Sequence, residues 1–274
     1  MLDTAPDITA FQRFERDGWD RVAHLYDATW APLTTQLVEP LLDAAAVGAG
    51  QRVLDLACGP GYVAAAAAAR GAELVALDIS AAMVEEARRR HPDLDVRQGA
   101  AERVDLPDQT FDRVLMSFGI LHVADPPAVL REAHRLLRTG GRFAFTVWAA
   151  PDVSPGARLI DGAISAHALP VDDLPSGPDT YFLADPQRIG ATLDAAGFTA
   201  SEVTLLTARW RVPNADWVIA AERHAGVRTA ALLARQDAHR LADIAAAIAD
   251  GIRTFRDGDG YLLPMAAQVV VAWR

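Results

Sequence analysis

The segment Val53–Gly61, with the sequence VLDLACGPG, constrains the fold of this chain more than any other segment. It joins an apolar run to a glycine-rich turn, and the alanine-rich residues 62–70 that follow favour a helix. Glycines let a backbone approach a ligand closely and adopt unusual dihedral angles. The amides at the N-terminus of the following helix attract a negative group. A strand, a ligand-binding turn and a helix in this order predict a parallel α/β sheet.

A second apolar run, Leu74–Asp78, ends in an acid. An Asp at the tip of the strand beside a glycine loop can accept both hydroxyls of a ribose. The first run also carries an acid, Asp55, close to the loop. A carboxylate there is unfavourable beside a pyrophosphate but favourable beside an α-amino group and a sulfonium. The two acids therefore favour a nucleoside cofactor with a positively charged end.

The amino-acid composition limits the reactions and partners that are possible for this protein. All 26 basic residues are arginine, which excludes Schiff-base enzymes, lysine bases and the P-loop lysine. The formal net charge of -10 argues against a nucleic-acid partner. The apolar share of 51% is sufficient for a packed core, so extensive disorder is excluded.

Other features concern the compartment. The single cysteine, Cys58, rules out an intramolecular disulfide and suits a reducing environment. No apolar stretch approaches the roughly 18 residues of a membrane span, and residues 1–18 are polar and acidic, unlike a signal peptide. A cytoplasmic protein without membrane contact is predicted, and the alanine- and arginine-rich usage favours a bacterial source with a GC-rich genome.

Three regions are predicted within a single domain: an N-terminal helical cover (1–47), a sheet-forming core (48–150), and substrate-lid segments followed by the last two strands (151–274). In the first region, apolar residues at mostly three- and four-residue steps predict a pair of helices with a break at Gly18. These apolar residues are Ile8, Phe11, Phe14, Trp19, Val22, Tyr26 and Trp30.

The core alternates short apolar runs with amphipathic stretches, which is typical of strands and helices of a parallel sheet. The expected strands are Arg52–Ala57, Glu73–Asp78, Leu94–Gln98, Asp112–Ser117 and Arg142–Trp148. The expected helices are Tyr62–Arg70, Ser80–Arg90 and Pro127–Arg138, with Ser80 as an N-cap. In the last region we expect a loop with one short helix at Pro151–Pro178, a helix at Asp185–Ala196, a strand at Glu202–Val212, one long helix from Val227 to Ile252 and a buried strand at Gln268–Trp273.

Several short motifs, spread over roughly residues 20–150, belong together. They are Asp55, Cys58, Gly59 and Gly61; Leu77-Asp78-Ile79-Ser80 and Met83; Gly99-Ala100-Ala101-Glu102; Leu106-Pro107; Phe111-Asp112; Leu121-His122-Val123; Glu132; Leu136-Leu137-Arg138; and Gly140-Gly141-Arg142. In order and spacing they resemble the class I S-adenosylmethionine-dependent methyltransferases. The resemblance is closest to the branch of the ubiquinone/menaquinone C-methyltransferases and small-molecule methyltransferases.

The resemblance implies a doubly wound, Rossmann-like sheet of seven strands with the last strand antiparallel, closed by helical lid segments over the carboxyl ends of its strands. It also implies S-adenosyl-L-methionine as cofactor and methyl transfer to a small, hydrophobic or aromatic metabolite, on oxygen, nitrogen or carbon. The protein is expected to act as a monomer or homodimer.

The cofactor contacts implied by the resemblance can be placed in this chain. Asp55 and the backbone of Ala57, Gly59 and Gly61 would hold the methionine part, and Asp78 the ribose. Ile79 and Met83 would pack on the adenine, with Ala101 and Glu102 beside it. Ser117 and Phe118 would lie beside the transferable methyl, and Tyr26 would cover the cofactor. The family's adenine-contacting Asp is replaced by Ala100, so that side-chain contact is missing.

His122 follows the fourth strand and is the candidate general base, with Asp125 close enough in sequence to orient it. The alternative is that His122 only caps the turn before the next helix, in which case Tyr181 or His167 becomes the candidate. No metal site is expected, because His24, His91, His134, His224 and His239 have no mutual ligand spacing.

Other residues have plain structural interpretations. Cys58 is expected to pack under the cofactor rather than to act as a nucleophile. Arg88-Arg89-Arg90 is expected to be a solvated helix C-terminus. The tryptophans at 19, 30, 210 and 217 are expected either in an aromatic substrate pocket or in the core.

Two other functions remain open from the residues. Residues 59–64 also match the dinucleotide fingerprint G-x-G-x-x-A, but a chain without lysine cannot carry the Tyr-x-x-x-Lys pair of an NAD(P)-dependent oxidoreductase. A methyltransferase-like chain can also bind the cofactor without transferring its methyl, as a cyclase, an isomerase or a regulatory module.

Overall fold

The computed structural model describes residues 9–274. Its strands are β1 (Arg52–Leu56), β2 (Glu73–Asp78), β3 (Asp95–Gln98), β4 (Phe111–Ser117), β5 (Leu137–Trp148), β6 (Ala200–Val212), β7 (Arg256–Asp257) and β8 (Gly260–Trp273). Its α-helices are α1 (Ala10–Val22), α2 (Tyr26–Thr29), α3 (Ala31–Thr34), α4 (Val38–Ala44), α5 (Tyr62–Ala69), α6 (Ala81–Arg90), α7 (Pro126–Leu136), α8 (Pro155–His167), α9 (Pro186–Ala195), α10 (Ala215–Ala225), α11 (Arg228–Leu233) and α12 (Ala238–Gly251). Short 3-10 turns lie at Ala23–Leu25, Thr35–Leu37, Ile120–His122 and Ile252–Phe255.

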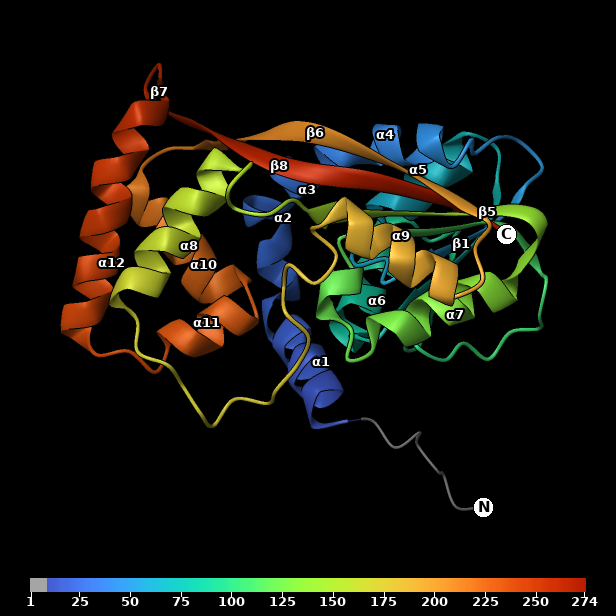
Figure 1. Cartoon of the computed structure of the whole chain (residues 1–274), viewed down its shortest axis with the longest axis horizontal. Coiled ribbons are helices and arrows are strands. Elements are labelled where there is room, and N and C mark those ends of the chain that lie inside the picture. Colours follow the sequence, from blue (N-terminus) through green and yellow to red (C-terminus); the bar gives the residue numbers. More distant parts are fainter. Residues whose placement is uncertain (1–8) are drawn as a thin grey trace.

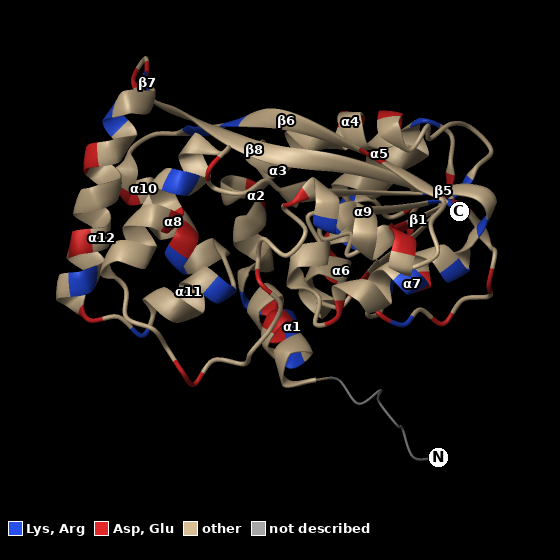
Figure 2. Cartoon of the chain, in the orientation of Figure 1, with Lys and Arg blue, Asp and Glu red and all other residues tan. Residues whose placement is uncertain are grey.

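The strands form one sheet in the order β3-β2-β1-β4-β5-β8-β6, with β7 added as a two-residue strand against β8. β1 to β5 pair in parallel, whereas β8 runs antiparallel to both β5 and β6. The predicted seven-stranded, doubly wound sheet with an antiparallel last strand is therefore confirmed. β8 carries no charged residue and is buried along most of its length (Figure 2), as expected for a strand covered on both faces.

The two faces of the sheet bury alternate residues of the same strands. In β4, Leu115 packs into the layer with α4 and α5, whereas Val114 and Met116 pack into the layer with α7 and α9. This period of two follows from the alternating direction of side chains along a strand. Helices on both faces bury the central strands, so the carboxyl ends of β1, β2, β4 and β5 become the accessible edge of the core.

A second group of helices, α8, α10, α11 and α12, lies beyond that edge, on the left in Figure 1. The long strands β6 and β8 extend from the core toward this group, and α1 lies between it and the core (Figure 1). The arrangement places α1 and the helical group over the ends of the parallel strands, as the sequence predicted for the lid segments. No helix within residues 9–274 is both long and apolar enough to cross a membrane.

The predicted break at Gly18 is wrong, because α1 continues through this residue. A Cβ atom at Gly18 would lie 2.4 Å from a methyl carbon of Val227, so the glycine permits a close approach of two segments rather than a turn. The first helix ends instead at the 3-10 turn Ala23–Leu25. Ile8 lies outside the described residues.

The single long helix predicted from Val227 to Ile252 is also wrong. The chain forms α11 and α12 there, and the Asp237 side chain accepts a hydrogen bond from the Arg240 amide as the N-cap of α12. The apolar spacing continues across this break, so periodicity alone did not reveal it. The Ser80 cap was predicted correctly, since its hydroxyl accepts a hydrogen bond from the Met83 amide.

Element ends differ as well. The last strand begins at Gly260 rather than Gln268, and β5 begins at Leu137 rather than Arg142. The helix expected within the loop Pro151–Pro178 is α8, which spans 13 residues.

Candidate active site

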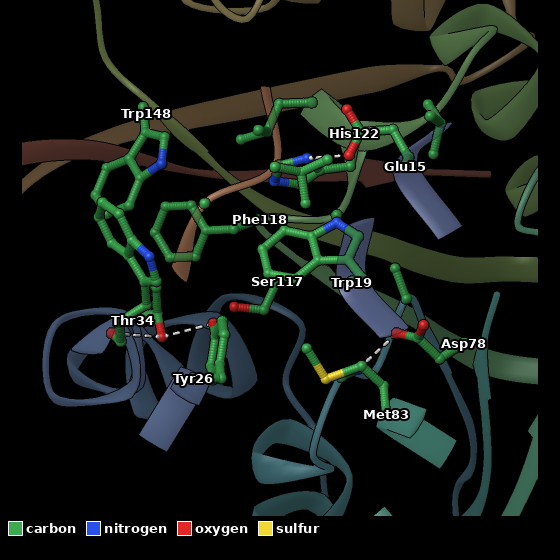
Figure 3. Close-up of a pocket in the computed structure, with 18 of the residues that line it drawn as sticks. Glu15, Trp19, Tyr26, Thr34, Asp78, Met83, Ser117, Phe118, His122 and Trp148 are labelled. Atoms are coloured by element: carbon green, nitrogen blue, oxygen red, sulfur yellow. Dashed lines mark hydrogen bonds and ion pairs between the residues drawn. The ribbon is translucent and has the colours of Figure 1, made fainter. Parts of the chain in front are cut away.

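A large pocket lies where the carboxyl ends of β1, β2, β4 and β5 meet α1 and the second helical group. Figure 3 shows Asp78 and Met83 at one end of it, Trp148 at the other, and Ser117, Phe118 and Trp19 between them. Of the predicted site residues it is lined by Tyr26, Asp55, Ala57, Gly59, Asp78, Ile79, Met83, Ala101, Glu102, Ser117, Phe118 and His122. The structure thus brings together residues from six separate segments of the chain.

Gly61 is the one predicted site residue that does not line this pocket. It is the N-cap of α5 and has a φ angle of 88°, a left-handed conformation that favours glycine. Gly59 also has a positive φ, of 52°. The glycine pair therefore turns the chain sharply between β1 and α5 and leaves the backbone of residues 57–60 facing the pocket.

Two non-glycine residues at the pocket share this unusual conformation. Ala57, after β1, has a φ of 53°, and Phe118, after β4, has a φ of 54°. A bulky residue in the left-handed region is strained, and such strain concentrates at functional sites. Both positions lie directly at the carboxyl end of a parallel strand.

Asp55 is buried in the pocket wall with 1% of its surface exposed. Neither carboxylate oxygen meets the geometric requirements of a hydrogen bond within the described residues. Burial raises the pKa of Asp55 well above its ordinary value, the nearby Asp78 raises it further, and the Ala64 amide lowers it only partly. A buried carboxyl group without a partner is costly in the absence of a ligand, and a cation in the pocket would compensate it.

Asp78 is also buried, but backbone amides hold it. Its two oxygens accept hydrogen bonds from the Ser80 amide at 2.9 Å and the Gly59 amide at 2.8 Å. Burial raises the pKa of Asp78 to about 6, although the Ser80 and Gly59 amides oppose this rise. The amides fix the carboxylate at the tip of β2, and each oxygen keeps capacity to accept a further hydrogen bond from a ligand hydroxyl.

Glu102 has a structural partner as well as a place in the pocket wall. Its side chain accepts a hydrogen bond from the Ala124 amide at 3.0 Å, which joins the loop after β3 to the loop that follows His122. Ile79, Met83 and Ala101 form an apolar part of the wall nearby. This part of the pocket is apolar, as a site for an adenine ring requires.

The region between the two ends of the pocket is aromatic. Phe118 and Trp148 stack with ring centroids 4.2 Å apart. The Ser117 hydroxyl and the Thr146 hydroxyl lie 3.3 Å apart, and the Thr146 hydroxyl also accepts a hydrogen bond from the Phe118 amide. The Tyr26 hydroxyl shares a hydrogen bond with Thr34 at 3.0 Å, and burial raises the pKa of Tyr26.

His122 lies beside Glu15 of α1, not beside the orienting acid that the sequence suggested. Its Nδ1 atom is 3.0 Å from a Glu15 carboxylate oxygen, and Trp19 packs edge-on against the ring (Figure 3). Asp125 instead caps α7 by accepting a hydrogen bond from the Ala128 amide. The predicted role of Asp125 is therefore wrong, because a local backbone donor occupies it.

Glu15 is itself held by Arg228 of α11. The Arg228 Nε atom donates to Glu15 at 2.6 Å, and its terminal nitrogens donate to the carbonyls of Pro178 and Leu121. Burial alone would raise the pKa of Glu15, but the neighbouring His122 and Arg228 hold it below its ordinary value. An ionised Glu15 thus fixes His122 against segments that are far apart in sequence.

Sequence reasoning missed Glu15 and Arg228. One signal was present for Glu15, because it lies on the buried face of α1 with Phe11, Gly18 and Val22. An acid on the apolar face of an amphipathic helix indicates a buried partner. Arg228 lies in a short helix with no motif around it.

Two further acids fix the cover to the core. Asp20 accepts hydrogen bonds from the Ser80 hydroxyl at 2.6 Å and the Ala82 amide at 3.1 Å. Asp27 accepts hydrogen bonds from Tyr62 and Arg90. The expectation that residues 88–90 form a solvated helix end is correct only for Arg89, since Arg88 donates to the Val96 carbonyl and Arg90 binds the cover.

The structure also bears on the other residues for which the sequence left alternatives open. Trp19, Trp30 and Trp148 line the pocket, whereas Trp210 is fully buried and stacks on Trp30. Burial raises the pKa of the Cys58 thiol well above its ordinary value, which favours the unreactive thiol form. Within the described residues, no three His, Cys, Asp or Glu side chains cluster as metal ligands. Tyr181 lines the pocket and His167 does not.

Comparison with known proteins agrees with this geometry. Residues 54–145 match the model of the methyltransferase domain. A demethylmenaquinone methyltransferase from Clavibacter sepedonicus is 35% identical over 236 residues, which cover 78% of this chain and 93% of the relative.

Two solved structures share the fold. The YcgJ protein from Bacillus subtilis matches with a TM-score of 0.60 at 18% identity, over 87% of this chain and 98% of that chain. Phosphoethanolamine N-methyltransferase 2 from Haemonchus contortus, solved with S-adenosyl-L-methionine, matches with a TM-score of 0.58 at 17% identity, over 98% of this chain and 60% of that chain.

This chain belongs to the class I S-adenosylmethionine-dependent methyltransferases, of the menaquinone C-methyltransferase type. It is an enzyme that transfers a methyl group from S-adenosylmethionine to a small molecule. The residues present fit that cofactor, because the unpartnered carboxyl of Asp55 faces the pocket as a cationic amino group requires. A cofactor that instead placed a pyrophosphate there would bring two negative groups together, which is unfavourable.

Proposed function

We propose that this enzyme methylates a hydroxylated aromatic ring of the quinol type, at a ring carbon, with His122 as the general base. The observation that carries the proposal is the His122–Glu15 pair in the wall of an aromatic pocket. The name of the Clavibacter relative supports a quinone-like acceptor. The alternative of a cofactor-binding protein without methyl transfer is not favoured, because the relative is a methyltransferase.

The lining of the pocket supports the following cofactor contacts. Asp55 and the backbone of residues 57–60 hold the amino acid part, Asp78 accepts the ribose hydroxyls, and Ile79 and Met83 pack on the adenine. Ala101 and Glu102 complete the adenine wall, Ser117 and Phe118 border the methyl, and Tyr26 covers it. Gly61 acts through the turn that aims these groups rather than by contact.

S-adenosylmethionine supplies an electrophilic methyl group on a sulfonium, which is open to in-line displacement. His122 takes the proton of the acceptor hydroxyl, and the electron density that remains makes the ring carbon nucleophilic. That carbon would then accept the methyl group while sulfur keeps the electron pair of the broken bond, and the ring would release its carbon-bound proton to solvent once the pocket opens. The aromatic walls would position the ring for this attack and exclude water, and such positioning contributes roughly 7–11 kcal/mol.

Other features of the proposal concern the whole protein. We propose that the enzyme acts as a monomer or homodimer. The acidic net charge supports the absence of a nucleic-acid partner. The buried free thiol of Cys58 supports a reducing, cytoplasmic location. We also propose that the cover 1–47, the core 48–150 and the segments 151–274 act as one domain around this pocket.

The test is turnover with a reduced 2-prenyl-1,4-naphthoquinone under anaerobic conditions. The expected products are S-adenosylhomocysteine and a quinol that is heavier by one methyl group, both detected by mass spectrometry. His122→Ala should lower kcat by roughly 10²–10⁴-fold, while calorimetry shows nearly unchanged S-adenosylhomocysteine binding.

Glu15→Gln should also lower kcat, but by a smaller factor, because the His122 imidazole is still present and loses only the carboxylate that fixes it. His239→Ala is the matched control, since that histidine is exposed on α12 and does not line the pocket. Wild-type turnover by the His122→Ala variant would refute the general-base role. Methylation of another class of acceptor, with none of the quinol, would refute the substrate class.

A further inference from the structure

The helical group contributes acids to the pocket that neither the cofactor nor the base requires. Glu222 of α10 and Asp161 of α8 both line the cavity, and Tyr181 lies with them. The Tyr181 hydroxyl donates a hydrogen bond to Asp161. The three side chains therefore form a polar cluster in the lid half of the pocket.

Glu222 is the unusual member of this cluster. It is 8% exposed and lines the cavity, and no arginine or histidine of the described residues forms an ion pair with it. Its neighbours offer no compensation, because the charged group that acts on it is another acid, Asp161. A buried carboxyl beside a second carboxyl is costly unless a cation or donor joins it.

The charges around the pocket are unbalanced. Arg228 is the only arginine among the lining residues of the described chain, and Glu15 already pairs with it. Asp55 and Asp78 face the cofactor end. Glu222 and Asp161 are then left as two acids without a positive partner in an otherwise aromatic and apolar cavity.

We propose that Glu222 and Asp161 form a subsite for a protonated amine on the methyl acceptor. The ammonium group lies between the two carboxylates and donates hydrogen bonds to both, while Tyr181 orients Asp161. An acceptor that uses this subsite is a hydroxylated aromatic ring that also carries a basic nitrogen, whereas a quinol without an amine occupies the pocket and leaves the subsite unfilled. This subsite rests on the proposed function for the reacting ring but can be measured without it.

The subsite predicts a proton linkage. The pKa of Glu222 is raised to about 8 by burial and by Asp161, so its carboxyl is mostly neutral at pH 7. The other titratable groups of the cluster are Asp161, with a raised pKa, and Tyr181, which stays neutral. Seating an ammonium beside Glu222 favours its ionised form, so binding at pH 7 releases a proton.

The experiment compares tyramine with 4-ethylphenol, which has the same ring but no amine. Binding is measured by calorimetry on protein saturated with S-adenosylhomocysteine, so no turnover is needed. Tyramine should bind roughly 10- to 150-fold more tightly, as charged hydrogen bonds imply. Repetition in buffers of different ionisation enthalpy should show proton release with tyramine only.

Variants identify the subsite. Glu222→Gln should bring tyramine affinity down to that of 4-ethylphenol and abolish proton release, without changing 4-ethylphenol binding. Asp161→Asn should weaken tyramine in the same direction, which keeps the test valid if the first variant folds poorly. Asp216→Asn, an exposed acid on the same helix α10, should change neither ligand.

Equal binding of the two probes, or absence of binding by both, would overturn the subsite. So would Glu222→Gln with wild-type tyramine affinity, or binding without proton release. These outcomes do not depend on methyl transfer. Failure of quinol methylation with intact tyramine binding would refute the reacting ring and leave the amine subsite standing.

Discussion

Buried acids are the most informative residues in this chain. Asp55 and Glu222 are both buried, and within the described residues neither carboxylate oxygen of Asp55 has a hydrogen-bond partner. Burial raises the pKa of both groups, so each is costly in its ionised form unless a ligand compensates it. Asp55 was predictable, because it belongs to a strand–loop motif with a recognisable order. Glu222 was not, because its environment arises from Asp161 and Tyr181 on separate segments that no local pattern joins. His122 was predictable from its place after a strand, but its partner Glu15 was not.

Asp78 gives the sharpest prediction at this scale. Asp78→Asn should weaken S-adenosylhomocysteine binding by roughly 10- to 150-fold, because a charged acceptor of the ribose hydroxyls is lost. Since the pKa of Asp78 is about 6, wild-type binding should also weaken as pH falls from 7 to 5, and the variant should lose this pH dependence. Asp93→Asn, at an exposed site before β3, is the control. A dissociation constant for Asp78→Asn equal to that of the wild type would mean that the ribose is held elsewhere.

At the scale of elements, the strands of the sheet core were predictable from the sequence, whereas the points at which the surrounding helices begin and end were not. Strands β1, β2 and β4 were found within one or two residues, because each is a short apolar run bounded by polar residues. Helix α1 was misread at Gly18, since a glycine that permits close packing looks the same in sequence as one that ends a helix. The α11–α12 break was missed for a similar reason, because a capping Asp interrupts a continuous apolar spacing.

Gly18 tests this explanation. Gly18→Ala should lower the free energy of unfolding by about 1–3 kcal/mol, because a Cβ atom would lie 2.4 Å from a Val227 methyl. Gly190→Ala, in α9, has nothing within 4 Å of its new Cβ and should be neutral or stabilising by about 0.5–1 kcal/mol. Urea denaturation measures both, and Val227→Ala should rescue part of the Gly18→Ala loss in a double-mutant cycle. Equal changes in the free energy of unfolding for the two variants would mean that the close contact with Val227 is not the reason for a glycine at position 18.

In the whole molecule, the pocket joins two parts that are stabilised differently. The core relies on apolar layers on both faces of the sheet. The cover also buries apolar residues such as Leu33 and Leu41 in the core, and it adds polar contacts at Asp20, Asp27 and Glu15. These polar contacts join residues 35 or more positions apart, so their pairing could not be predicted from one sequence. The site therefore places several charged groups in the interior. Burying these charges lowers the stability of the ligand-free protein.

That cost predicts the dependence of stability on pH. The pKa of Glu222 is raised to about 8 and that of Asp78 to about 6, so the folded state binds more protons than the unfolded state between about pH 4 and 8. The stabilisation from these groups is complete at low pH and is lost as pH rises through the folded pKa values. Acids with lowered pKa values, such as Glu86 at about 2, act in the opposite sense, but their contribution is complete by about pH 5.

Urea denaturation of the ligand-free enzyme should therefore give a lower free energy of unfolding at pH 8 than at pH 6, by an amount on the order of a few kcal/mol. Glu222→Gln removes one of the groups that contribute to this slope and should flatten the profile, so that its stability relative to the wild type improves as pH rises. Asp216→Asn, which changes an exposed acid on the same helix, should keep the wild-type slope. Parallel profiles for the wild type and Glu222→Gln would show that Glu222 is already ionised and compensated in the folded state, because only a group whose protonation differs between the folded and unfolded states at pH 6 to 8 contributes to the slope there.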